Sequence, residues 1–150
     1  MLEWLIPDLD WYLALGHLRD LVLAYLLAIP IAWDREVRHR TVGLRTFPLV
    51  AVAACGYALI GFAVLESSDA QARIMQGLIT GIGFIGGGAI LKESGSVQGT
   101  ATAASLWATG AIGLAVASHR FEIAILVSIV TFLTLRFLKP LMNTSSETDE

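Results

Sequence analysis

Six charged residues at two places in the chain could bind a cation or pair with one another. They are Asp34, Arg35, Glu36, Arg45, Lys92 and Glu93. Carboxylate oxygens, together with several waters, are the ligands that Mg²⁺ prefers. Basic residues stand directly beside these carboxylates, so salt bridges are favoured over a metal site. No metal ligand set is therefore assigned.

A glycine-rich stretch suggests a second kind of chemistry. GIGFIGGGAILKESGSVQGTATAAS, residues 81–105, begins with the GxGxxG pattern of dinucleotide-binding turns. That fingerprint needs a preceding strand, a helix that opens at the glycines and an acidic residue about 20 positions later. Here the glycines lie within an uncharged apolar run, which leaves no room for a strand. Close helix packing is favoured, and no cofactor is predicted.

Small residues at helical spacing indicate where such packing could occur. Gly81 and Gly83 each belong to a pair of small residues four positions apart, which is typical of crossing membrane helices. A second stripe, Ser105, Thr109 and Gly113, follows on the next apolar run. We predict that the two helices cross closely at these faces. In the alternative interpretation, Gly86, Gly87 and Gly88 break the helix near its end and expose backbone to a ligand or an ion.

The loop between these runs is rich in Gly, Ser and Thr, so residues 95–102 are predicted not to be helical. The next helix is expected to start near Thr100 or Thr102, with a hydroxyl capping its free N–H groups. A helix N-terminus beside Lys92 favours an anion. Gly99, Thr100 and Thr102 are therefore a candidate anion site, with ordinary capping as the favoured alternative.

Residues typical of catalysis do not cluster in the sequence. The three histidines are scattered, and Ser105 has no histidine nearby in the chain. The single cysteine, Cys55, excludes an intrachain disulfide and is predicted to be a small packing residue. We predict that the protein is not an enzyme.

Composition shows which elements must position these residues. The chain is 55% hydrophobic with a mean hydropathy of +0.68, and only 15% of its residues are charged. Soluble domains carry about 25% charged residues. The net charge of −3 argues against a nucleic-acid partner. Uncharged runs long enough to cross a bilayer cover residues 46–65, 74–91 and 94–118, flanked by shorter candidates at 18–33 and 121–138.

These runs predict an all-α membrane protein with about five transmembrane helices in residues 18–141. Residues 1–17, with Trp4, Trp11 and Tyr12, are predicted to form a short helix on the membrane surface, and the acidic tail 142–150 to be disordered. Seven of the ten basic residues lie on the side of the membrane where the C-terminus is expected, and three lie on the other side. This excess predicts an outside N-terminus and a cytoplasmic C-terminus. No predicted span carries a carboxylate near its centre.

Three segments resemble the MgtC/SapB family of bacterial inner-membrane proteins. They are AWDREVRHRTVGLRTFPLVAVAA, GIGFIGGGAILKESGSVQGTATAASLWATGAIGLA and LKPL, and the resemblance covers about Leu21 to Leu141. The chain departs from the family at residues 32–34, 86–88 and 99–102. It resembles the short form, which has no C-terminal cytoplasmic ACT-like domain.

The resemblance implies a role in growth under magnesium limitation and, in pathogens, in virulence. Long members are thought to act on other membrane proteins, such as ATP synthase, and on membrane potential. The favoured function is a regulator in the inner membrane that contacts partners through its helix faces, with the lipid bilayer around it and a homodimer expected. The alternative is a transporter or channel for a cation or small solute, and an enzyme on a lipid or envelope substrate is the third.

A weak repeat relates the two charged loops, since Arg35 and Lys92 each open a segment that continues to a glycine and a threonine. If the repeat is real, the loops lie side by side. We therefore predict a contact between Glu93 and Arg45 or between Glu36 and Lys92.

Overall fold

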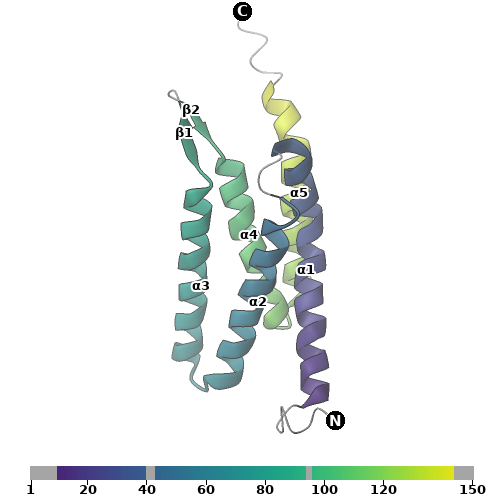
Figure 1. Ribbon diagram of the computed structural model, residues 1–150, viewed down its shortest axis with the longest axis vertical. Helices are drawn as coiled ribbons and strands as arrows, with labels where there is room; N and C mark the ends of the chain where they lie inside the picture. The colour runs from purple at the N-terminus through teal and green to yellow at the C-terminus, as the bar shows by residue number, and fades with distance from the viewer. Residues whose placement is uncertain (1–9, 40–42, 94–95, 144–150) are drawn as a thin grey trace, which may run out of the picture.

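The chain folds into a bundle of five long helices (Figure 1). A computed structural model describes residues 10–39, 43–93 and 96–143. The helices are α1 (Trp11–His39), α2 (Thr46–Val64), α3 (Ser68–Gly88), α4 (Thr100–Ala117) and α5 (Phe121–Asn143). Two short antiparallel strands, β1 (Leu91–Glu93) and β2 (Ser96–Gln98), connect α3 to α4. The predicted all-α membrane architecture is confirmed.

Successive helices run in alternate directions along the bundle (Figure 1). The β1–β2 hairpin, the end of α1, the start of α2 and the end of α5 lie at one end, which we call the hairpin end. The short connections from α2 to α3 and from α4 to α5 lie at the other end. Helix α1 therefore begins at the end away from the hairpin, and α5 finishes at the hairpin end.

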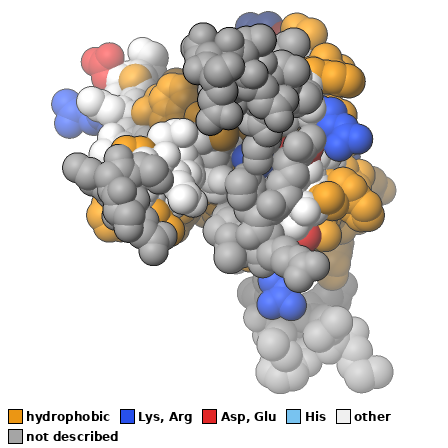
Figure 2. Space-filling model, turned by 90° about the horizontal axis from the view of Figure 1, so that it is seen from above, with side chains coloured by type: hydrophobic (Ala, Val, Ile, Leu, Met, Phe, Trp, Pro, Cys, Tyr) orange, Lys and Arg blue, Asp and Glu red, His pale blue; other side chains and the backbone are white. Residues whose placement is uncertain are grey.

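Four of the five helices are long and apolar enough to cross a membrane: α1, α2, α4 and α5. The exception among the described helices is α3, which carries Asp69 and Arg73 in its first half and five glycines in its second. It nevertheless runs beside α2 and α4 over most of their length (Figure 1). Seen from the hairpin end, hydrophobic side chains lie around the outer rim of the bundle, as a lipid environment requires (Figure 2).

Helix α1 is longer than the sequence predicts. It begins at Trp11, where the Asp10 carboxylate accepts hydrogen bonds from the backbone N–H groups of Tyr12 and Leu13 at 2.9 and 3.2 Å. Residues 11–17 belong to this helix and not to a separate surface helix, so the boundary expected at residue 17 is not a break in the chain. Residues 1–9 and 144–150 lie outside the described part, and with them most of the predicted tail.

The central contact of the bundle joins α2 and α4, the helix pair that packs most extensively. Gly113 lies so close to α2 that an added Cβ would overlap the Ala51 carbonyl oxygen and lie 2.9 Å from the Cys55 nitrogen. The stripe of Ser105, Thr109 and Gly113 is buried, but Gly113 packs against α2 and not against α3. That part of the packing prediction was wrong. The predicted burial of Cys55 is confirmed.

Helices α3 and α4 do pack, although at other positions than predicted. The Gly86 backbone approaches Ala103, and an added Cβ would lie 3.3 Å from the Ala103 carbonyl oxygen. Further along, a Cβ on Gly110 would overlap the Ile82 side chain. The other glycines singled out on α3 have nothing within 4 Å of an added Cβ: Gly81, Gly83, Gly87 and Gly88. The helix continues unbroken to Gly88 and ends there, so it is not interrupted within the bundle.

The loop after α3 is not helical in its described part, as predicted, but forms the β1–β2 hairpin. Helix α4 starts at Thr100, also as predicted. The expected hydroxyl cap is wrong, because the N-cap residue is Gly99, in the left-handed conformation with φ of 85° and with no side-chain capping bond. A Cβ at Gly99 would overlap the Ala89 carbonyl oxygen, so this close approach requires glycine.

Candidate functional site

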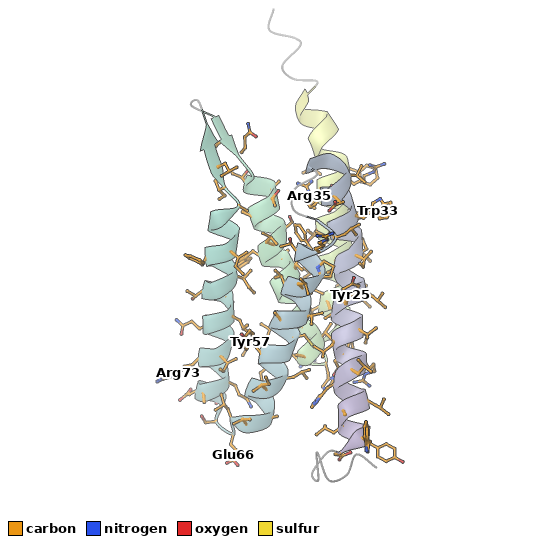
Figure 3. The ribbon with its side chains drawn as sticks, viewed as in Figure 1. Tyr25, Trp33, Arg35, Tyr57, Glu66 and Arg73 are labelled. Carbon is orange, nitrogen blue, oxygen red and sulfur yellow. The ribbon has the colours of Figure 1, made fainter. Side chains whose placement is uncertain are left out.

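The more buried of the two ion pairs in the described chain lies at the hairpin end of α1. Arg35 Nη2 donates to Asp34 Oδ2 at 3.0 Å, and both side chains are at most 3% exposed. In Figure 3, Arg35 lies at this end of the bundle, while the neighbouring Trp33 lies on the outer side of α1. Taking two charges out of water costs several kcal/mol per ion, which their mutual attraction and further hydrogen bonds must offset.

The arginine of this pair is not fully satisfied. Arg35 Nε is buried and has no hydrogen-bond partner within the described part of the chain. A buried donor without a partner is uncommon in folded proteins, because its lost hydration is not replaced. Arg35 also lies in the last turns of α1, where the helix dipole favours a positive charge. The pair is therefore a polar centre enclosed at the membrane boundary.

Glu36, the next residue, organises the connection from α1 to α2. Its Oε2 atom accepts a hydrogen bond from the backbone N–H of Leu44 at 3.1 Å. Gly43 is buried against it, and an added Cβ there would overlap the Glu36 side chain. The carboxylate thus holds the start of α2 against the end of α1.

The remaining members of the predicted charged cluster are only partly placed. Arg45 is the N-cap residue of α2 and is exposed. Lys92 and Glu93 form part of β1, but their side chains lie outside the described part of the structure. The predicted contacts of Glu93 with Arg45 and of Glu36 with Lys92 therefore stay predictions. Among the described residues, no group of three His, Cys, Asp or Glu could hold a metal ion.

A further buried carboxylate lies inside the membrane-spanning part of α1. Asp20 is 2% exposed, and the candidate span runs from Trp11 to Val37. Arg19 donates to Asp20 Oδ1 from both Nε and Nη2, at 2.9 and 2.8 Å, while its own side chain is 58% exposed. A buried ionisable residue within a membrane span is costly and marks a candidate functional position.

The sequence interpretation missed Asp20 because it started the first span at Leu18, which placed Asp20 at the membrane edge. The expectation that no span carries an inner carboxylate is therefore wrong. Trp11 and Tyr12 were the available signal, since aromatic side chains favour the membrane interface. With the interface at Trp11 and a rise of 1.5 Å per residue, Asp20 lies about 13 Å farther along the helix.

The outer side of α3 is not covered by any described part of the chain. Gln76, Thr80, Gly83 and Gly87 are all exposed and recur at helical spacing, and we call them the outer stripe of α3. The Thr80 hydroxyl donates to the Gln76 carbonyl oxygen of its own helix at 2.8 Å. Both glycines of the stripe leave the helix backbone accessible, since nothing lies within 4 Å of an added Cβ.

Comparison with known proteins identifies relatives over most of this chain. The profile of the MgtC family matches residues 21–144, which include the buried ion pair and all of α2 to α5. Protein MgtC of Brucella abortus (strain 2308) is 37% identical over 120 residues, which are 79% of this chain and 50% of that protein. Protein MgtC of Salmonella typhimurium (strain 14028s / SGSC 2262) is 36% identical over 114 residues, or 76% of this chain and 48% of that protein.

A relative with a different name has a similar level of identity. The Escherichia coli (strain K12) protein named "Putative magnesium transporter YhiD" is 35% identical over 122 residues, which are 77% of this chain and 57% of that protein. The chain thus spans about half the length of the curated relatives that it matches. No solved structure matches the chain.

Proposed function

The chain belongs to the MgtC family of multi-pass membrane proteins, and from this premise we propose that it regulates other membrane proteins by contact between helices. The role is not enzymatic in this proposal. The protein acts in the bacterial inner membrane, where it serves adaptation to magnesium limitation. In a pathogen it also serves virulence. The hairpin end faces the cytoplasm, in keeping with the excess of basic residues predicted on that side.

The outer stripe of α3 is the observation that carries the proposal. Lipid chains are as apolar as leucine, so helices associate in membranes through close packing and hydrogen bonds. Gly83 and Gly87 allow another helix to approach the α3 backbone, and Gln76 offers an exposed amide about two turns before them on the same stripe. The partner is a helix of another inner-membrane protein, such as ATP synthase, or a second copy of this chain in a homodimer.

We expect the double variant Gly83→Leu/Gly87→Leu to lose activity and keep its fold. Two leucines would hold a partner helix away from the stripe, and an added Cβ at either position meets nothing within 4 Å in the described part of the chain. The measurement is growth of a strain that depends on this protein at low magnesium, with the amount of folded protein in the membrane measured in parallel. Gly16→Leu on α1 is the matched control, since an added Cβ there also meets nothing within 4 Å. Normal growth of the double variant would exclude the stripe as the contact surface.

Transport of a cation is the second candidate function, and Asp20 is the observation that favours it. A carboxylate within a span is typical of ion pathways, and one relative carries the name of a magnesium transporter. Purified protein in liposomes that contain a magnesium-sensitive dye would separate the two functions. A regulator gives no flux above that of empty liposomes, whereas a transporter gives flux that Asp20→Asn abolishes.

A further inference from the structure

A long groove lies between α2 and α3, on a different side of α3 from the outer stripe. Its volume is about 660 Å³. Its walls are mostly apolar, among them Leu49, Val50, Ile82 and Ile85. Gly77 and Gly81 widen it, because each leaves open space where a side chain would project. Leu49 and Ile85 are exposed, so the groove is open to the surroundings of the bundle.

The groove has charged groups at its two ends. Arg45 and Thr46 line it at the hairpin end, and Arg73 lines it toward the opposite end, where Figure 3 shows that residue. On α2, the lining residues extend from Thr46 to Tyr57. A helical rise of 1.5 Å per residue makes this about 16 Å, close to half of a hydrocarbon core of about 30 Å. Measured from Arg45 along α2, the groove is therefore about as long as the hydrocarbon part of one leaflet is thick.

The two arginines are not equivalent. Within the described part of the chain, Arg45 is in none of the ion pairs and is the N-cap residue of α2, whose first turn contains no acidic residue. The backbone N–H groups of Thr46 and Phe47 already donate to the Gly43 carbonyl oxygen, so the guanidinium supplies the positive charge at that point. Arg73 is in neither of these ion pairs either, but Asp69 stands four residues before it on α3, a spacing at which opposite charges on a helix attract.

We propose that this groove is a binding site for an anionic phospholipid. One acyl chain lies along the apolar walls between α2 and α3, and the phosphate lies at Arg45 and the Thr46 hydroxyl. The apolar part of the site selects a lipid over a soluble anion, and the charged end selects an anionic headgroup over a zwitterionic one. This site is independent of the outer stripe, because Gly83 and Gly87 do not line the groove.

The test uses the purified full chain in a neutral detergent. Dioleoylphosphatidylglycerol and dioleoylphosphatidylcholine are titrated separately, and the apparent Kd of each is taken from the shift in thermal unfolding. We expect phosphatidylglycerol to bind about fivefold more tightly, the effect of one basic residue on an anionic lipid. Glycerol phosphate, which has the headgroup charge and no acyl chain, should give no shift. Equal affinity for the two lipids would overturn the proposal. A shift of the unfolding midpoint on addition of glycerol phosphate without lipid would also overturn it.

Three variants locate the site. Arg45→Gln should abolish the preference for phosphatidylglycerol, whereas Arg73→Gln, the matched control at the other end, should retain it. Gly81→Leu should fill the groove and weaken the binding of both lipids at least fivefold. A preference that survives Arg45→Gln would exclude the assigned headgroup position. If Gly81→Leu changes the oligomeric state and leaves lipid affinity unchanged, a helix of a second copy occupies the groove and the lipid proposal is wrong.

Discussion

Replacing Asp34 by alanine should lower the free energy of unfolding by about 3 to 5 kcal/mol, since it leaves a buried arginine without its counter-charge. Arg35 is 3% exposed at its side chain and already has one donor, Nε, without a partner in the described chain. Loss of the Asp34 carboxylate leaves the guanidinium with still fewer acceptors in a place that water does not reach. The measurement is the midpoint of thermal unfolding of the purified protein in detergent.

Two further variants separate the charge effect from lost packing. Glu122→Ala, which removes an exposed carboxylate from the first turn of α5, should change the free energy of unfolding by less than about 0.5 kcal/mol. The double variant Asp34→Leu/Arg35→Met should recover most of the lost stability, since apolar residues of similar volume can replace a buried pair. A double variant as unstable as Asp34→Ala would show that the packing of these side chains, and not the unpaired charge, is responsible.

Gly113→Ala should also destabilise the bundle strongly, by about 2 to 3 kcal/mol, because one added methyl group overlaps the backbone of the neighbouring helix. The atoms in its way are the Ala51 carbonyl oxygen and the Cys55 nitrogen, neither of which can rotate aside as a side chain would. Helices α2 and α4 would have to separate along their most extensive contact. The expected result is a lower unfolding midpoint and a larger fraction of aggregated protein in size-exclusion chromatography.

Gly77→Ala on α3 is the matched control for this effect. It makes the same chemical change within a helix, but an added Cβ there meets nothing within 4 Å. Alanine favours the helix over glycine by up to about 1 kcal/mol, so this variant should be as stable as the parent or more so. If both alanine variants behaved alike, close approach of α2 and α4 at Gly113 would not be a source of stability.

Much of the fold could be predicted from the sequence, because the length of an apolar run reflects a fixed bilayer thickness. The number of helices, the start of α4 and the non-helical loop before it followed from charge-free runs and from Gly, Ser and Thr residues. Helix ends were less predictable. Arg19 and Asp20 looked like a boundary because charges usually end a span, yet in α1 they pair with each other, and the helix extends to Trp11.

Packing partners could not be predicted in the same way. A stripe of small residues shows that some helix can approach, but it does not say which one. Gly113 could have faced α3 or α2, and the structure shows it against α2. Only part of the charged cluster could be predicted, because the sequence does not say which segments come together. Asp34 and Arg35 pair as neighbours, whereas the bond from Leu44 to Glu36 depends on how the chain turns between α1 and α2.

The weak apolarity of α3 has a consequence for how the protein is made. Its first half carries Asp69 and Arg73, and of its residues Gly86 is the one that the bundle buries fully. A segment of this kind gains little by leaving the translocon alone, because charged groups and glycine backbone favour water over lipid. Its close contacts are with Gly61 of α2 and with Ala103 and Gly110 of α4. We therefore expect stable membrane insertion of α3 to wait until the ribosome has synthesised α4, so that α3 and α4 enter the bilayer together as a helical hairpin against α2.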